Sequence, residues 1–216
     1  MHSMKTKFGK VVATLAIAGI ASVSLAACGE DDSSKDAVQS IAAVDSLTGE
    51  TTAVTLDQGF ADALASLKLT PGVTGTAKLT DGALVFPVTG GNVKYFKPGT
   101  VDPYVIGQIQ HEGSGFSLTA GDTTVEINNL NVDPGISRVY GDVLVNGKLA
   151  VASAYIFTLD GSTLKPLQTE GTNAILEGTR VLISPVAAEL LNSTFKTDAV
   201  TSDLLVGIAK ITIATK

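Results

Sequence analysis

Apolar and polar residues alternate along most of the chain after residue 50, which is the pattern of strands with one buried face. Two such runs, Arg138 to Asn146 and Lys148 to Leu159, predict a hairpin around an Asn-Gly turn. This spacing predicts a mainly β domain, either an antiparallel β-sandwich or a barrel-like fold. Turn dipeptides recur at short intervals: Asp81-Gly82, Gly90-Gly91, Pro98-Gly99, Pro134-Gly135, Asn146-Gly147 and Asp160-Gly161.

Two segments break the strand rhythm and predict two short helices, near residues 57–67 and 184–193. Asp57 and Ser184 have side chains that accept hydrogen bonds from the first turn of a helix, as N-cap residues do. Pro185 fits the first helical position, where its missing N–H costs nothing. The first segment places three apolar residues on one helical face: Phe60, Leu64 and Leu67.

The two predicted helices are each followed by a Gly-x-Ala-Lys-apolar strand, Gly75 to Leu79 and Gly207 to Ile211. The two caps, Asp57 and Ser184, are five residues closer together in sequence than the two glycines. The connection from helix to strand is therefore five residues longer in one segment than in the other. A relic of duplication, two elements that pair across one sheet, and chance all account for this similarity.

The first 27 residues have the layout of an export signal. Lys5, Lys7 and Lys10 form a basic start, and the run from Val11 to Ala27 carries no charge. This run has about 17 residues, the bottom of the range for a spanning helix, and acidic rather than basic residues follow it. These features favour a cleaved signal over a permanent transmembrane anchor.

The end of the apolar run, Leu25-Ala26-Ala27-Cys28, resembles the lipobox of bacterial lipoprotein precursors. The resemblance implies that cleavage occurs before Cys28, that diacylglycerol is attached to its sulfur, and that acyl chains such as palmitate anchor the protein. Two or three acyl chains make membrane attachment durable, whereas one chain is marginal. We therefore expect a protein of the cell membrane or cell envelope, held outside the cytoplasm by lipid.

The segment after Cys28 is acidic and rich in serine, which is typical of a solvated linker. We assign residues 1–27 to the signal peptide, 28–50 to a lipidated flexible linker and 51–216 to a single β-rich domain. Loss of the three signal lysines leaves 12 basic and 21 acidic residues, a net charge of −9 (12 − 21). This charge argues against nucleic-acid binding and against extended contact with an anionic membrane surface.

Residues that carry out chemistry are scarce. Once the signal is removed, His111 is the only histidine and no cysteine nucleophile remains, which excludes multi-histidine metal sites and cysteine catalysis. Gly113-Ser114-Gly115 is interpreted as a turn rather than a phosphate-binding loop, because no helix follows it. We expect no enzymatic activity, no metal site and, on the first interpretation, no cofactor.

His111 lies at the end of an alternating run, Val105 to His111. Strand parity places it on the more apolar face together with Val105, Gly107 and Ile109. Two interpretations follow: an imidazole at the edge of the core that bonds a backbone carbonyl, or a ligand to a molecule bound at the rim of the sheet.

Three stretches favour the second interpretation: residues 86–93 (F-P-V-T-G-G-N-V), 107–118 (G-Q-I-Q-H-E-G-S-G-F-S-L) and 125–133 (V-E-I-N-N-L-N-V-D). Together they resemble the HtaA-type haem-uptake domain of actinobacterial surface proteins. This family is β-rich, and the resemblance implies that His111 lies near a bound haem. The family's tyrosine ligand lies in an early segment, and Val54 to Leu69 contains no tyrosine. The candidates for a tyrosine ligand are therefore elsewhere: Tyr95, Tyr104 and Tyr140.

Two functional hypotheses follow. The first is a lipid-anchored, extracytoplasmic protein whose β-rich domain has a binding or structural role without catalysis, its ligand or envelope partner unspecified. The alternative is a haem-binding surface lipoprotein of HtaA-like type, with His111 and Tyr104 as the candidate ligand-binding residues.

Overall fold

The computed structural model describes residues 38–215, so the predicted signal segment and Cys28 lie outside the described residues. The described chain forms thirteen strands, two α-helices and one 3-10 turn, and it is mainly β as predicted. The helices are α1 (Gln58–Ser66) and α2 (Pro185–Phe195), and the 3-10 turn is η1 (Pro134–Ile136). The strands are β1 (Ala42–Val44), β2 (Glu50–Leu56), β3 (Thr70–Gly75), β4 (Lys78–Thr80), β5 (Ala83–Pro87), β6 (Gly90–Tyr95), β7 (Val105–Ala120), β8 (Thr123–Asp133), β9 (Arg138–Val145), β10 (Lys148–Asp160), β11 (Gln168–Glu170), β12 (Asn173–Ile183) and β13 (Leu205–Ala214).

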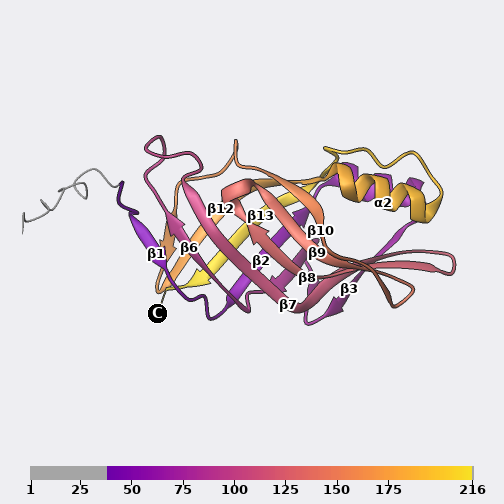
Figure 1. Ribbon diagram of the computed structural model, residues 1–216, viewed down its shortest axis with the longest axis horizontal. Coiled ribbons are helices and arrows are strands. Elements are labelled where there is room, and N and C mark those ends of the chain that lie inside the picture. Colours follow the sequence, from indigo (N-terminus) through magenta and orange to yellow (C-terminus); the bar gives the residue numbers. More distant parts are fainter. Residues whose placement is uncertain (1–37, 216) are drawn as a thin grey trace, which may run out of the picture. The chain divides into compact units, whose positions relative to one another are not determined.

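All the strands belong to one curled antiparallel sheet, as Figure 1 shows. Its order is β1-β6-β7-β8-β9-β10-β12-β13-β2-β5-β4, with β3 beside β7 and β11 beside β12. Strands β5 and β6 lie near opposite ends of this order, yet only Val88 and Thr89 separate them in sequence. The short connection therefore brings the two ends of the sheet together, and the predicted fold is confirmed in its barrel-like form.

The predicted hairpin around Asn146-Gly147 is confirmed. Strands β9 and β10 pair directly before and after this dipeptide, with Val145 opposite Lys148. Asn146 and Gly147 have φ angles of 51° and 75°. A two-residue turn with both φ angles positive matches the twist of the strands it connects, which explains why Asn-Gly predicts it reliably.

Both predicted helices are present with the expected caps. The Asp57 carboxylate accepts a hydrogen bond from the Gly59 N–H at 2.8 Å, at the start of α1. The Ser184 hydroxyl accepts one from the Ala187 N–H at 3.0 Å, and Pro185 is the first residue of α2. Capping residues therefore located both helix starts from sequence alone.

The two Gly-x-Ala-Lys segments occupy different places in the sheet. Gly75 ends β3, which pairs with β7, whereas Gly207 lies in β13, between β12 and β2. A Cβ at Gly75 would lie 1.9 Å from the Gly113 carbonyl oxygen, and one at Gly207 would lie 2.1 Å from that of Thr55. Each glycine is thus needed where a neighbouring strand approaches closely.

The prediction of a turn at Gly113-Ser114-Gly115 is wrong. Strand β7 continues through these residues, and the register against β8 shifts between His111 and Gly115. The glycines admit a β-bulge, with φ = 70° at Gly113, and the Asn129 side chain accepts a hydrogen bond from the Gly113 N–H at 3.0 Å. The bulge bends a long strand where the sequence suggested that it ended.

The folded part of the chain begins before residue 51, the boundary predicted from composition. Within residues 38–50, β1 pairs with β6, and the Leu47 side chain is only 3% exposed. The Leu47 N–H donates to the Gly91 carbonyl oxygen at 2.9 Å. This segment is ordered by tertiary contacts, which the acidic, serine-rich composition just after Cys28 does not reveal. In residues 38–215, neither helix has the length and apolar character needed to cross a membrane.

We predict that Ser184→Ala lowers the free energy of unfolding by about 2 kcal/mol. Ser184 is fully buried, and its hydroxyl also donates to the Tyr155 carbonyl oxygen at 2.6 Å, so alanine removes two hydrogen bonds to the backbone. Urea denaturation measures the change. Ser193→Ala, which removes an exposed hydroxyl from the same helix, is the control, and equal losses in both variants would contradict the prediction.

Candidate functional site

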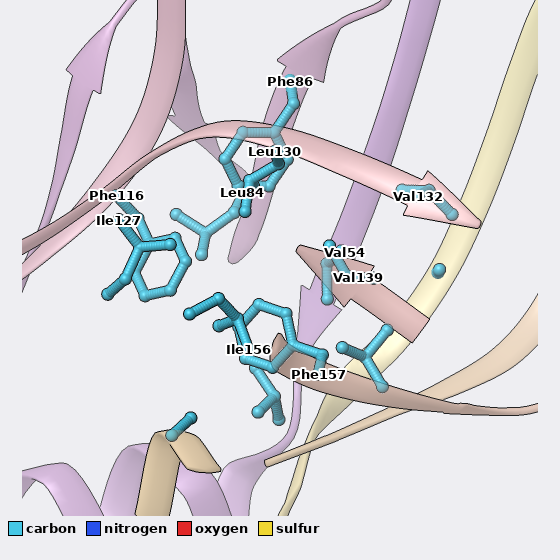
Figure 2. Packing of buried hydrophobic residues seen from close by; sticks show 14 of the residues in the cluster. Val54, Leu84, Phe86, Phe116, Ile127, Leu130, Val132, Val139, Ile156 and Phe157 are labelled. Atoms are coloured by element: carbon cyan, nitrogen blue, oxygen red, sulfur yellow. The ribbon is translucent and has the colours of Figure 1, made fainter. Parts of the chain in front are cut away.

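The curled sheet encloses a cavity of about 320 Å³, near the lower end of the range for small-molecule sites, roughly 300–1,000 Å³. Its walls are almost entirely apolar and come from strands on both sides of the closure. Figure 2 shows several of these side chains converging from different strands: Val54, Leu84, Phe86, Phe116, Leu130, Val132, Val139 and Phe157. The cavity is a natural site for an apolar molecule.

His111 lines this cavity, on the inner face of β7 that strand parity predicted. The side chain is 1% exposed, and its Nδ1 lies 2.9 Å from the Pro87 carbonyl oxygen. A carbonyl oxygen only accepts, so Nδ1 carries the proton and donates. Burial lowers the pKa of His111, and the bond to Pro87 opposes this only in part. The imidazole is therefore neutral at physiological pH.

The other ring nitrogen of His111, Nε2, is buried and has no hydrogen-bond partner. With the proton held on Nδ1, Nε2 presents a lone pair at the wall of an apolar cavity. A buried acceptor without a partner is costly, by about 1–3 kcal/mol, and calls for an explanation. A ligand that donates a hydrogen bond, or a metal within a ligand, would satisfy it.

The Nδ1 bond also holds the closure of the sheet together. Pro87 ends β5, and His111 belongs to β7, which flanks β6 on the other side of the connection. Two neighbouring bonds reinforce this junction: the Thr89 N–H donates to the Gln110 carbonyl at 2.8 Å, and the Glu112 N–H donates to the Thr89 hydroxyl at 2.9 Å. His111 thus makes a structural hydrogen bond through Nδ1, while its Nε2 remains an acceptor without a partner.

Thr52, which sequence reasoning missed, is a second polar residue of the cavity wall. It is 5% exposed, and its hydroxyl has no partner. It shares the inner face of β2 with Val54 and Leu56. The sequence did contain a signal for Thr52. The alternation of polar and apolar residues along β2 predicts an apolar residue at this position, and threonine carries a hydroxyl there.

Tyr104 also lines the cavity, close to the start of β7. Its ring meets that of Tyr95 edge-on, with centroids 5.7 Å apart. Burial and the neighbouring Tyr95 raise the pKa of Tyr104, which disfavours the phenolate. Tyr104 and His111 are seven residue steps apart along extended chain, roughly 23 Å, so the two side chains contact different parts of the cavity.

The other predicted tyrosines lie apart from the cavity wall. Tyr95 is buried but does not line the cavity, and Tyr140 lines a polar groove on the outer face of the sheet. In the early segment, the aromatic residue that lines the cavity is Phe60 of α1, which has no oxygen to offer. The structure thus brings His111, Thr52, Tyr104 and Phe60 to one cavity.

The polar groove on the outer face explains how the long strands bend. Asp142 accepts hydrogen bonds from the Asn129 side-chain amide at 3.0 Å and from the Ser153 N–H at 2.9 Å, and the bond from Asn129 is the main cause of its lowered pKa. Asn129 and Ser153 both have positive φ and lie at bulges. Within residues 38–215, no cluster of three or more His, Cys, Asp or Glu side chains is placed to hold a metal ion.

Comparison with solved structures identifies the fold. The chain matches the C-terminal domain of HtaA from Corynebacterium glutamicum with a TM-score of 0.54, over 78% of this chain and 98% of that one. The chain has the HtaA C-terminal domain fold. The sequence identity is 13%, so the likeness concerns architecture and not residues.

A domain-swapped dimer of the H434A variant of the same HtaA domain matches with a TM-score of 0.45 at 15% identity, covering 73% of this chain and 91% of that one. No family model matches the sequence, and no curated protein matches it. The match to the HtaA C-terminal domain with the TM-score of 0.54 confirms the HtaA-type resemblance found in the sequence, at the level of the fold.

We predict that the free energy of unfolding falls as the pH is lowered from about 7.5 to 5.5. The pKa of His111 in the folded state lies below the ordinary value of about 6.5, so the unfolded chain binds more protons between the two values. The contribution of neutral His111 to the free energy of unfolding is complete above about pH 6.5 and is lost as the pH falls toward the folded-state pKa. The free energy of unfolding then falls by no more than about 1.4 kcal/mol per pH unit.

Urea denaturation across this pH range tests the assignment, with His111→Gln as the variant that cannot titrate. The free energy of unfolding of this variant should depend less on pH than that of the wild type, because the contribution of His111 is missing. Glu112→Gln, on the opposite face of the same strand, should keep the wild-type slope. Identical slopes in wild type and His111→Gln would show that His111 is not held neutral by burial.

Proposed function

We propose that this protein is a lipid-tethered, extracytoplasmic module that binds an apolar molecule inside its curled sheet and catalyses no reaction. The observation that carries the proposal is the bare Nε2 of His111 at the wall of an apolar cavity. Its other nitrogen bonds a main-chain carbonyl rather than a carboxylate, so the histidine is not oriented as in a catalytic triad.

Haem is the ligand we propose. A neutral imidazole whose Nδ1–H is fixed by a carbonyl oxygen is oriented to give its Nε2 lone pair to iron. The apolar walls suit a porphyrin, and the fold similarity to the HtaA domain supports the same assignment. When bound, haem would supply an iron centre, and His111 is the described residue that would hold it.

The chain differs from the HtaA-type pattern in its early segment, where Phe60 lines the cavity in place of a tyrosine. We therefore propose His111 as the iron ligand itself. Tyr104 lines the same cavity, but its raised pKa makes it the weaker candidate.

We predict that hemin added to the purified protein gives a Soret band that saturates at one equivalent. His111→Ala should weaken hemin binding at least tenfold, about the smallest effect expected when a contact to a metal ligand is lost. Absorbance titration measures the affinity. Glu112→Ala, on the outer face, is the control.

The same titration separates three outcomes. Loss of the Soret band in Tyr104→Phe but not in His111→Ala would make the tyrosine the ligand. A wild-type protein that binds no hemin would refute haem as the ligand. If His111→Ala then lowers only stability, the role of His111 is limited to closing the sheet.

The lipid tether is proposed on the sequence of the lipobox. We predict that Cys28→Ala leaves the protein unprocessed or releases it from the membrane fraction, because the sulfur that carries the diacylglycerol is missing. Cell fractionation and mass spectrometry of the N-terminus measure this. Residues 1–27 found on the mature wild-type protein would contradict the prediction.

A further inference from the structure

We propose that the Thr52 hydroxyl is a second polar contact for the ligand, so that the cavity selects an apolar molecule whose buried part carries a polar group. This inference rests on the proposal that the cavity binds a ligand, and it does not depend on that ligand being haem.

The pattern of satisfied and unsatisfied buried groups carries the inference. Among the residues that the structure describes, four polar or charged side chains are buried: Thr52, His111, Ser114 and Ser184. The Ser114 hydroxyl donates to the His111 carbonyl at 3.0 Å, and the Ser184 hydroxyl donates to the Tyr155 carbonyl at 2.6 Å. Neither serine lines the cavity. Of these four, the two with an unpartnered atom, Thr52 and His111, both line it. The third such atom among the described residues, Oδ1 of the half-buried Asn131, belongs to the polar groove on the outer face.

Thr52 and His111 lie on either side of Phe86. Thr52 is the Cα partner of Phe86 across β2 and β5, and the Phe86 and His111 rings have their centroids 6.1 Å apart. Adjacent strands are about 4.8 Å apart, so Thr52 and His111 are both neighbours of Phe86 in the same part of the cavity wall. Because a hydroxyl both donates and accepts, Thr52 can bond a polar group of an otherwise apolar molecule, whatever part of that molecule Nε2 contacts.

The cost to the ligand-free protein supports the same role. Position 52 belongs to the inner face of β2, where Val54 and Leu56 are apolar, and valine has nearly the shape of threonine. A threonine kept there without a hydrogen bond makes the empty domain less stable than valine would. A bound ligand supplies the missing partner.

Two apolar probes of nearly equal shape test the inference: 1-aminoanthracene, which carries one protic group, and anthracene, which carries none. Thr52→Val should weaken the binding of 1-aminoanthracene about fivefold, the loss of one hydrogen bond, and leave anthracene binding unchanged. It should also raise the melting temperature of the ligand-free protein. Thr55→Val, on the exposed face of the same strand, is the matched control and should change neither affinity.

Three results would overturn the inference: equal effects of Thr52→Val on both probes, a ligand-free variant less stable than wild type, or wild-type protein that binds neither probe. Hemin titration is read separately. Failure of the wild type to bind hemin refutes haem as the ligand, whereas the probe pair still decides whether Thr52 contacts what the cavity binds.

Discussion

The two-residue connection between β5 and β6 is the constraint on which the rest of the structure depends. It joins strands that lie near opposite ends of the sheet order, so the sheet must curl until its two ends meet. The hydrogen bond from His111 to Pro87 is formed at this junction, together with the bond from Thr89 to Gln110.

Curling so tightly requires the long strands to bend, and the bends are built from bulges. Positive φ angles at Gly113, Asn129 and Ser153 lie on β7, β8 and β10, and the Asp142 carboxylate binds two of these segments from the outer face. Bulges increase local twist and curvature, which is how an extended sheet comes to enclose a cavity. The same bend of the sheet thus forms the polar groove on its outer face and the apolar cavity on its inner face.

The cavity wall combines good packing with two unsatisfied polar atoms, while a third buried atom without a partner, Oδ1 of Asn131, lies at the outer groove. Phe116 and Phe157 stack with ring centroids 5.7 Å apart, and most of the wall is apolar. Buried polar groups in folded proteins are nearly always bonded, so exceptions that share one cavity point to a missing partner more than scattered exceptions would. Apolar side chains at Thr52 and His111 would avoid the cost of an unpartnered buried atom, and such costs are common at binding sites.

The sequence by itself determined the features that depend on a few neighbouring residues. The Asn146-Gly147 turn, the caps at Asp57 and Ser184 and the inward side of His111 follow from local backbone rules and strand parity, and the structure has all of them. The weak HtaA-type resemblance also indicated the right fold. Local rules failed at Gly113, where glycines that permit a turn serve a bulge instead.

Only the tertiary structure decided which groups are left without partners. Whether Nε2 of His111 or the hydroxyl of Thr52 finds a hydrogen bond depends on strands distant in sequence that meet at the closure, and strand parity says nothing about them. The same holds for Leu47, whose segment is ordered by contacts with β6. Periodicity fixes the face on which a residue lies, but the atoms opposite that face are fixed by long-range packing.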